Sequence, residues 1–233
     1  MQKLIIKGKK TLSGSIKISG SKNATLPILA AAILTDKTLI LKNIPFVQDV
    51  YTMINLLKFI GLSVKVSKKK NTLNISNNKK LKTVAPYNLL KTMRAGVLVL
   101  GPLLAKYNKA KVSLPGGCAI GARPVDLHLF ALEKLGAKIK IKNGYIHASA
   151  KNGLKGAIIK FPSISVGATE NAILAAVSAK GKTIISNCAI EPEIQDMILF
   201  LKKMGCNVNF IGKRKILVNG ISKFKSVSHE IIF

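Results

Sequence analysis

Three stretches of the chain repeat the same order of hydrophobic and polar positions. In each, an amphipathic helical pattern ends at a glycine and runs into an alternating strand, a turn and a second strand. The glycines are Gly61, Gly136 and Gly205, and the second strands are predicted over residues 72–76, 145–150 and 215–219. Because glycine readily adopts the left-handed backbone angles that end helices, the pattern predicts three copies of one unit.

The residues before each helix repeat as well. Predicted strands at 15–19 and 157–161 lead into apolar helices at 23–34 and 168–179, and residues 87–104 supply the matching helix of the middle copy. A short strand follows each helix, and a second helix then begins at or near Asp49, Asp126 or Asp196, since helix N-termini favour negative charge. The predicted fold class is α/β (α+β), with three β-α-β-α-β-β repeats, helices inside and sheets outside.

The two ends of the chain fall outside this triplet. Residues 220–224 and 228–233 echo residues 8–18, and Phe233 stands within an apolar strand pattern. We therefore predict a complete three-repeat domain over residues 21–221. Residues 1–20 are expected to be outer strands of a second domain, and residues 222–233 to be the start of that domain, which is truncated here.

The charge of the chain changes this picture little. Its 38 basic and 9 acidic residues give a net charge of +29, which by itself suggests a polyanion partner. The lysines are spread along the chain, however, and tryptophan is absent, so stacking platforms for nucleic acid are scarce. Only Arg94, Arg123 and Arg214 are arginines, and arginine favours bidentate recognition of carboxylate or phosphate.

Cysteine and histidine spacing indicates neither disulfides nor a metal site. The cysteines Cys118, Cys188 and Cys206 are odd in number and far apart, and no Cys or His pair has metal-ligand spacing. Cys188, Cys206 and the three histidines are expected to be structural. No apolar run reaches the roughly 18 residues of a membrane span, and no export signal precedes residue 8. We expect a cytoplasmic protein without membrane contact.

Cys118 differs from the other thiols because its loop is the longest of the three that precede the second helices. Residues 115–126 hold three glycines, Cys118 and Arg123. Glycine permits close approach of the backbone to a ligand, and a thiol beside a cation has a lowered pKa. The loop matches neither a Walker A nor a dinucleotide-binding pattern, so we predict a reactive thiol in a binding loop.

Three further turns carry residues suited to anions. The turn at 19–24 sets Lys22 and Asn23 at a predicted helix N-terminus, and the turn at 163–169 offers free backbone donors that could hold a diphosphate. Arg94 stands near the start of the apolar helix of the middle copy.

Together these segments resemble the UDP-N-acetylglucosamine enolpyruvyl transferases. The matching motifs are Gly-Ser-Lys-Asn-Ala at 20–24, Ala-Pro-Tyr at 85–87 with Lys-Thr-Met-Arg-Ala at 91–95, Leu-Pro-Gly-Gly-Cys at 114–118, Ile-Gly-Ala-Arg-Pro-Val-Asp-Leu-His at 120–128, Ser-Val-Gly-Ala-Thr at 165–169 and Glu-Pro-Glu-Ile at 191–194. The cysteine loop separates this family from the related enolpyruvylshikimate phosphate synthases, which lack that cysteine. The resemblance covers the whole chain and implies the family's inside-out α/β barrel.

The resemblance also implies roles for individual residues. Cys118 would be the general acid that protonates phosphoenolpyruvate, and Lys22 and Arg123 would hold its phosphate and carboxylate. The residues expected to line the sugar-nucleotide site are Asn23, Arg94, Ala95, Arg123, Pro124, Val125, Asp126, Leu127, Ser163, Ile164, Ser165, Val166 and Gly167. The implied activity transfers the enolpyruvyl group to the 3′-hydroxyl of UDP-N-acetylglucosamine and releases phosphate, the first committed step of peptidoglycan precursor synthesis.

By the same resemblance we expect no cofactor, no metal, no nucleic acid and a monomer. Family members are roughly twice this length, and their second domain supplies an aspartate base and a further arginine, so we expect no turnover by these 233 residues alone. Two alternatives stay open: a binding-only fragment that holds the sugar nucleotide, and a basic nucleic-acid-binding protein.

Overall fold

The computed structural model describes residues 3–77, 79–91, 93–116 and 125–232. The strands form three four-stranded sheets of identical design, with orders β12-β1-β3-β2, β4-β5-β7-β6 and β8-β9-β11-β10. In each sheet the first two strands are parallel and the other neighbours are antiparallel. The strands are β1 (Leu39–Lys42), β2 (Ser63–Ser67), β3 (Thr72–Ser76), β4 (Val84–Ala85), β5 (Lys109–Ser113), β6 (Lys138–Lys142), β7 (Tyr145–Ser149), β8 (Ile158–Lys160), β9 (Lys182–Ser186), β10 (Asn207–Gly212), β11 (Lys215–Asn219) and β12 (Val227–Glu230).

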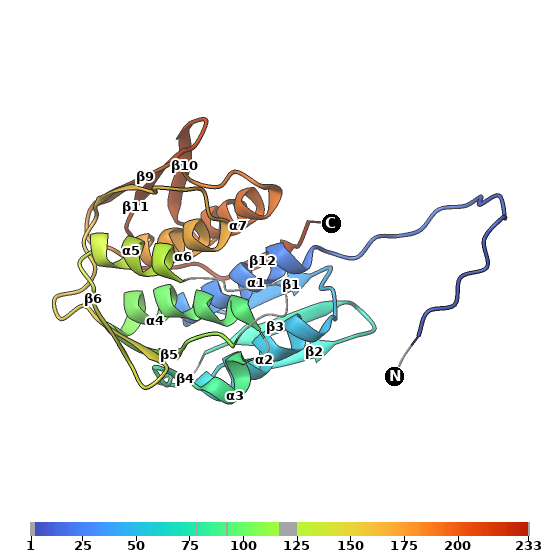
Figure 1. Ribbon diagram of the computed structural model, residues 1–233, viewed down its shortest axis with the longest axis horizontal. Coiled ribbons are helices and arrows are strands. Elements are labelled where there is room, and N and C mark those ends of the chain that lie inside the picture. The colour runs from blue at the N-terminus through green and yellow to red at the C-terminus, as the bar shows by residue number, and fades with distance from the viewer. Residues whose placement is uncertain (1–2, 78, 92, 117–124, 233) are drawn as a thin grey trace.

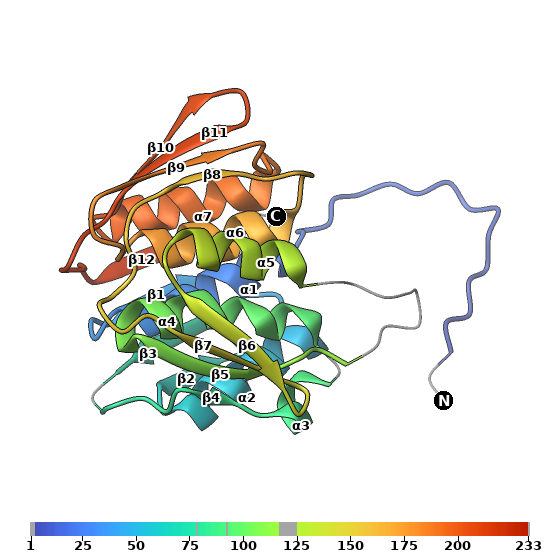
Figure 2. The ribbon, with the colours of Figure 1, turned by 60° about the vertical axis from the view of Figure 1, so that its left-hand side comes forward.

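The helices lie between the sheets (Figures 1 and 2). They are α1 (Lys22–Ala31), η1 (Ala32–Leu34), α2 (Gln48–Ile60), α3 (Tyr87–Leu90), η2 (Arg94–Val99), α4 (Leu100–Tyr107), α5 (Asp126–Lys134), α6 (Val166–Ala176) and α7 (Pro192–Lys203). Helices α1 and α6 are buried on almost every side, which explains their lack of a polar face. Strands such as β1 alternate buried and exposed positions, because only one face of each sheet is covered.

The predicted fold class is therefore confirmed: three related units enclose their helices and expose their sheets. One continuous cluster of buried apolar side chains joins all three units. Among the residues that the structure describes, no helix combines the length and apolar character needed to cross a membrane.

The first sheet obtains its parallel strand from a place that the sequence analysis did not predict. Residues 15–19, predicted as that strand, are exposed and carry no strand, and residues 3–19 extend away from the body (Figure 2). Their place is taken by β12, which pairs in parallel with β1 from Leu39↔Val227 to Lys42↔Glu230. An alternating apolar pattern such as that of residues 15–19 forms a strand only where another strand is free to pair with it. Strand β1 is already paired on both edges, with β12 and with β3.

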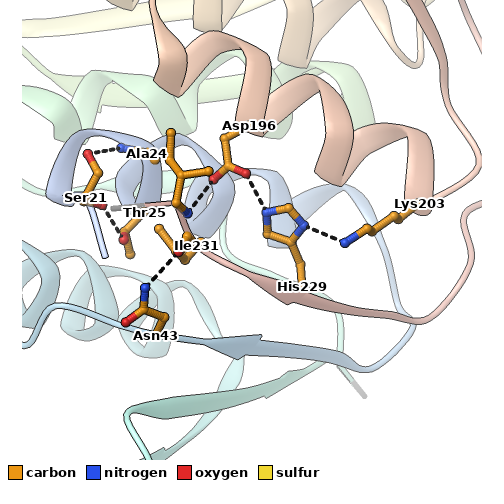
Figure 3. Close-up of polar contacts among 9 residues, drawn as sticks. Ser21, Ala24, Thr25, Asn43, Asp196, Lys203, His229 and Ile231 are labelled. Atoms are coloured by element: carbon orange, nitrogen blue, oxygen red, sulfur yellow. Dashed lines mark hydrogen bonds and ion pairs between the residues drawn. The ribbon is translucent and has the colours of Figure 1, made fainter. Parts of the chain in front are cut away.

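Strand β12 and the two residues after it are tied to β1, to Asn43 just after β1, and to α7. Ile231 N–H donates to the Lys42 carbonyl over 3.1 Å, and the Asn43 amide donates to the Ile231 carbonyl over 2.9 Å. The Asp196 carboxylate on α7 accepts from His229 Nε2 at 2.9 Å (Figure 3). The predicted boundary at residue 222 thus separates β12 from the sheet that it completes. The assignment of residues 1–20 and 222–233 to a second domain stays a prediction.

Asp196 also corrects the prediction that three acids stand at the starts of the second helices. Asp49 and Asp126 do lie in the first turns of α2 and α5. Asp196 lies in the second turn of α7, is 2% exposed and bonds His229, whereas Glu193 occupies the first turn. The prediction placed the start of the helix too late in the sequence. The helix begins at Pro192, about one turn before Asp196, because proline is favoured at the first helical position.

Candidate functional site

Helices α1 and α6 begin with the same cap. Ser21 and Ser165 each accept a hydrogen bond from the backbone N–H three residues on, at 3.3 Å. Thr25 Oγ1 then donates to the Ser21 carbonyl, as Thr169 Oγ1 does to the Ser165 carbonyl. The shared Ser-x-x-Ala-Thr sequence therefore fixes both N-termini in the same geometry.

These two N-termini and the start of η2 open on one cleft of about 670 Å³. In chain order the residues that line it are Lys22, Asn23, Leu26, Pro27, Asp49, Lys91, Met93, Arg94, Ala95, Val97, Leu98, Gly116, His128, Ser165, Val166, Gly167, Glu170 and Glu193. Two helix N-termini that open on one cleft present free backbone N–H groups and positive dipole ends to it. Such an arrangement suits an anionic ligand.

Cations from separate elements reinforce this preference. Lys22 comes from α1, Arg94 from η2, and Lys91 from the segment between α3 and η2. Lys22 Nζ lies 2.9 Å from Asp49 Oδ2, with 47% and 34% of the two side chains exposed. An exposed pair of this kind contributes only about 0–1 kcal/mol, so an entering phosphate can compete with Asp49 for Lys22 at small cost.

A buried polar network supports the wall of the cleft near α6. The Asn171 side chain accepts from Gly101 N–H at 2.8 Å, donates to the Val97 carbonyl and lies 3.1 Å from His128 Nδ1. Burial, followed by the positive charge of Arg94, lowers the pKa of His128 to about 4, against the opposing effect of Asp126. His128 is therefore a neutral side chain at pH 7, and it holds α5 against α6.

Two further carboxyl groups line the cleft. Glu170 is 5% exposed, and Glu193 is half-buried. Burial, and then the negative charge of Glu193, raise the pKa of Glu170 to about 8. Glu170 thus carries a proton at neutral pH, and the lining of the cleft combines cations with acidic groups.

The structure brings about half of the predicted site residues together in this cleft: Lys22, Asn23, Arg94, Ala95, Ser165, Val166 and Gly167. Val125, Asp126, Leu127, Ser163 and Ile164 lie outside its lining, before or at the starts of α5 and α6. Cys118, Arg123 and Pro124 lie outside the described residues. Gly116, two residues before Cys118, does line the cleft.

Five lining residues with titratable side chains were missed as site residues: Asp49, Lys91, His128, Glu170 and Glu193. His128 was interpreted as structural, which its contact with Asn171 supports, but it also faces the cleft. For Glu170 a signal did exist, because the equivalent positions of the other units are Leu26 and Leu98. Within the described residues no group of three His, Cys, Asp or Glu side chains could hold a metal ion.

Comparison with known proteins identifies relatives over almost the whole chain. Residues 6–232 match the family model described as EPSP synthase (3-phosphoshikimate 1-carboxyvinyltransferase). The chain is 58% identical over 232 residues to the UDP-N-acetylglucosamine 1-carboxyvinyltransferase of Pelagibacter ubique, and 53% identical to that of Endomicrobium trichonymphae. Each match covers 100% of this chain and 55% of the relative, so the chain spans about half the length of these curated relatives.

Solved structures show the same fold at much lower identity. The enolpyruvyl transferase NikO from Streptomyces tendae superposes with a TM-score of 0.81 at 17% identity, covering 97% of this chain and 53% of that one. EPSP synthase from Acinetobacter baumannii gives 0.78 at 18% identity, covering 96% and 51%. The relatives confirm the resemblance that the motifs indicated. The chain belongs to the EPSP synthase (3-phosphoshikimate 1-carboxyvinyltransferase) family.

Proposed function

We propose that this chain forms the sugar-nucleotide and phosphoenolpyruvate site of a UDP-N-acetylglucosamine 1-carboxyvinyltransferase. The reaction joins the enolpyruvyl group of phosphoenolpyruvate to the 3′-hydroxyl of UDP-N-acetylglucosamine and releases phosphate. It begins peptidoglycan precursor synthesis, and therefore cell wall biogenesis, in the cytoplasm. The names of the relatives at 58% and 53% identity support this substrate pair.

One observation carries the proposal: the N-termini of α1 and α6 share a cleft with Lys22, Lys91 and Arg94. Both substrates are phosphate esters, and this set of helix ends and cations is suited to phosphate groups. Two N-termini allow one phosphate group beside Lys22 and a diphosphate beside residues 165–167. The carboxyl groups of Glu170 and Glu193 are then left to contact groups without negative charge.

The proposed chemistry assigns the proton donor and two phosphoenolpyruvate-binding cations to residues of this chain. The Cys118 thiol gives a proton to the methylene carbon of phosphoenolpyruvate. The sugar 3′-oxygen bonds to the adjacent carbon, and its hydroxyl proton passes to a base in the second domain of the longer family members. Return of a methyl proton to the Cys118 thiolate and loss of phosphate from the adjacent carbon then restore the double bond. Lys22 and Arg123 hold the phosphate and carboxylate, where fixed cations stabilise developing charge.

The remaining predicted residues are proposed as ligand contacts. Asn23, Arg94 and Ala95 would border the sugar, and residues 123–127 and 163–167 the uridine diphosphate. Gly116 lines the cleft and precedes Cys118 by two residues, which supports a position of the thiol beside the phosphoenolpyruvate.

Titration calorimetry with UDP-N-acetylglucosamine at low and high salt tests the substrate class. We expect binding that survives 0.5 M salt, because hydrogen bonds and apolar contacts share the recognition with charge. Tight binding of duplex DNA with a steep dependence on salt, together with no binding of the sugar nucleotide, would instead favour a nucleic-acid-binding protein.

Selective alkylation tests the role of Cys118. Fosfomycin, an epoxide phosphonate that mimics phosphoenolpyruvate, should label Cys118 alone. Cys188 and Cys206 serve as internal controls, because they are buried and burial raises the pKa of both thiols, that of Cys206 to about 12. Mass spectrometry that finds equal labelling of the three thiols contradicts the assignment. Lys22→Val should slow labelling of Cys118 if Lys22 holds the phosphonate.

A further inference from the structure

Glu170 is the exception among three equivalent positions in the cleft. The fifth residue of α1 is Leu26, the fifth of η2 is Leu98 and the fifth of α6 is Glu170. All three side chains line the cleft. Two units therefore place an apolar side chain where the third places a carboxyl group, so packing alone does not require the acid.

The side chain of Glu170 is almost fully buried where it lines the cleft. It is 5% exposed, and within the described parts of the chain it makes no hydrogen bond. A buried polar group without a hydrogen bond is costly, unlike the leucines at the equivalent positions. The remaining open direction is the cleft, so a ligand there is the natural source of the missing hydrogen bond.

The chemistry of the site narrows the group that Glu170 can meet. The free N–H groups at the start of α6 suit an anion, and Glu170 lies about one helical turn, roughly 5–6 Å, further along the same helix. A second anion there would face Glu193, whose charge already raises the pKa of Glu170 to about 8. A protonated carboxyl group both donates and accepts hydrogen bonds, which matches a hydroxyl or an amide.

We propose that Glu170 is a specificity-determining residue that hydrogen-bonds a hydroxyl or amide group of the sugar carried by the diphosphate. This inference rests on the proposed function, since it takes the ligand to be a sugar nucleotide. Glu170 distinguishes a nucleotide that bears an N-acetylated sugar from one that ends at the diphosphate. The helix N-terminus recognises the diphosphate, and Glu170 recognises what is attached to it.

The test compares UDP-N-acetylglucosamine with UDP by titration calorimetry on the 233-residue chain and on Glu170→Leu and Glu170→Gln. Leucine restores the residue of the other two units, so we expect Glu170→Leu to fold, with circular dichroism as the check. Its affinity for UDP-N-acetylglucosamine should fall about 10- to 100-fold, the effect of removing one partner of a buried hydrogen bond, while its affinity for UDP stays the same. Glu170→Gln keeps a donor and an acceptor and should bind within about threefold of the wild type.

Glu133→Leu is the matched control, because Glu133 is exposed on α5 and lies outside the cleft. It should change neither affinity. Equal affinities for UDP-N-acetylglucosamine in the wild type and Glu170→Leu overturn the inference and leave the proposed function standing. An equal loss for both ligands shows that Glu170 contacts the nucleotide, which also overturns it. Failure of the wild-type chain to bind either ligand contradicts the proposed function itself.

Discussion

Helices α1 and α6 begin with the same cap but are joined to the preceding strand in different ways. The chain runs directly from β8 through Phe161 into Ser165 at the start of α6. The start of α1 instead meets the segment that follows β12 through a hydrogen bond, from Ser21 N–H to the Ile232 carbonyl at 2.6 Å. The third unit is one continuous piece of chain, whereas the first is completed by a distant segment.

We call the place where a strand leads into its helix a joint: β12 and α1 form the first joint, and β8 and α6 form the second. Matching contacts surround the two joints. The Asn43 amide donates to the Ile231 carbonyl at 2.9 Å, and the Asn187 amide donates to the Phe161 carbonyl at 3.0 Å. Both asparagines adopt a φ of 57°, a left-handed conformation that asparagine tolerates better than most residues. The architecture of the unit therefore depends on local hydrogen bonds and does not need a continuous backbone.

Removing His229 should have the largest effect, because only the first joint depends on it. Lys203 Nζ lies 3.2 Å from His229 Nδ1 and can only donate, so Nδ1 accepts and the Nε2–H donates to Asp196. His229→Ala leaves a 2% exposed Asp196 without this partner. We expect a loss of about 3–5 kcal/mol in the free energy of unfolding, measured in urea.

Two asparagine variants provide the comparison for that result. Asn43→Ala and Asn187→Ala remove equivalent contacts at the two joints, and Asn43→Ala should cost more because no peptide bond holds β12 to α1. Equal costs, with a small effect of His229→Ala, would show that the non-covalent joint contributes little to stability.

Glu170→Gln should remove a pH-dependent loss of about 2 kcal/mol in the free energy of unfolding. The pKa of Glu170 is raised to about 8 in the folded chain, so stability falls as pH rises from 4.5 to 8. The lowered pKa of His128, about 4, makes stability fall as pH drops from 6.5 to 4. The two slopes oppose each other between pH 4.5 and 6.5. Of these two groups only Glu170 contributes from pH 6.5 to 8, a loss of about 2 kcal/mol.

Glu170→Gln should abolish the loss between pH 6.5 and 8, as urea unfolding at a series of pH values will measure. The titratable and charged groups that line the cleft with Glu170 are Glu193 on α7, His128 on α5, Arg94 on η2, Lys22 on α1, Asp49 on α2 and Lys91. Glu133→Gln, at an exposed position, should retain the wild-type profile. A variant that still loses stability above pH 6.5 would assign that titration to another group.

Replacing the threonines of the two caps should give a smaller difference in the free energy of unfolding. Thr25 Oγ1 and Thr169 Oγ1 make the same contact with the cap carbonyl, but Thr169 Oγ1 also accepts from the buried Ala189 N–H at 3.0 Å. Thr169→Val should therefore destabilise the chain by roughly 1.5 kcal/mol more than Thr25→Val, since it leaves that N–H without a partner. Indistinguishable unfolding curves would exclude a role for the Ala189 contact.

Replacing the two cap serines should give the smallest difference in the free energy of unfolding. Ser21 and Ser165 accept the equivalent bond at 3.3 Å, so Ser21→Ala and Ser165→Ala should each cost about 1 kcal/mol. Thermal unfolding of both variants checks this expectation. A markedly larger loss at Ser21 would mean that its side chain also supports the contact with Ile232.

The repeated pattern allowed most of the fold to be predicted from the sequence. Helices that end at Gly61 and Gly205 were recognisable because periodicity and capping are local properties. The partner of β1 was not, because strand pairing between distant segments leaves no mark within either one. The hydrogen bond between His229 and Asp196 could not be predicted for the same reason. Neither residue belongs to a recognisable motif, and they are 33 positions apart in the sequence.

The candidate site was predictable where its residues lie at helix starts, as Lys22, Asn23 and Ser165 do. Cap sequences report local geometry, and free backbone donors follow from that geometry. Glu170 and Glu193 were not predicted as site residues, because burial and mutual repulsion depend on how α6 packs against its neighbours. Comparing equivalent positions of the three units would have singled out Glu170, whose counterparts are leucines.

The non-covalent joint at the start of α1 also sets an order of events during synthesis. Asn43 and Ile231, which meet beside it, are 188 residues apart, so at about 5–20 residues per second the ribosome needs roughly 10–40 s to make the second after the first. Until then β1 has an unpaired edge, and the N-terminus that carries Lys22 has no anchor. The second and third units can form while the chain is still growing, and the cleft is assembled last.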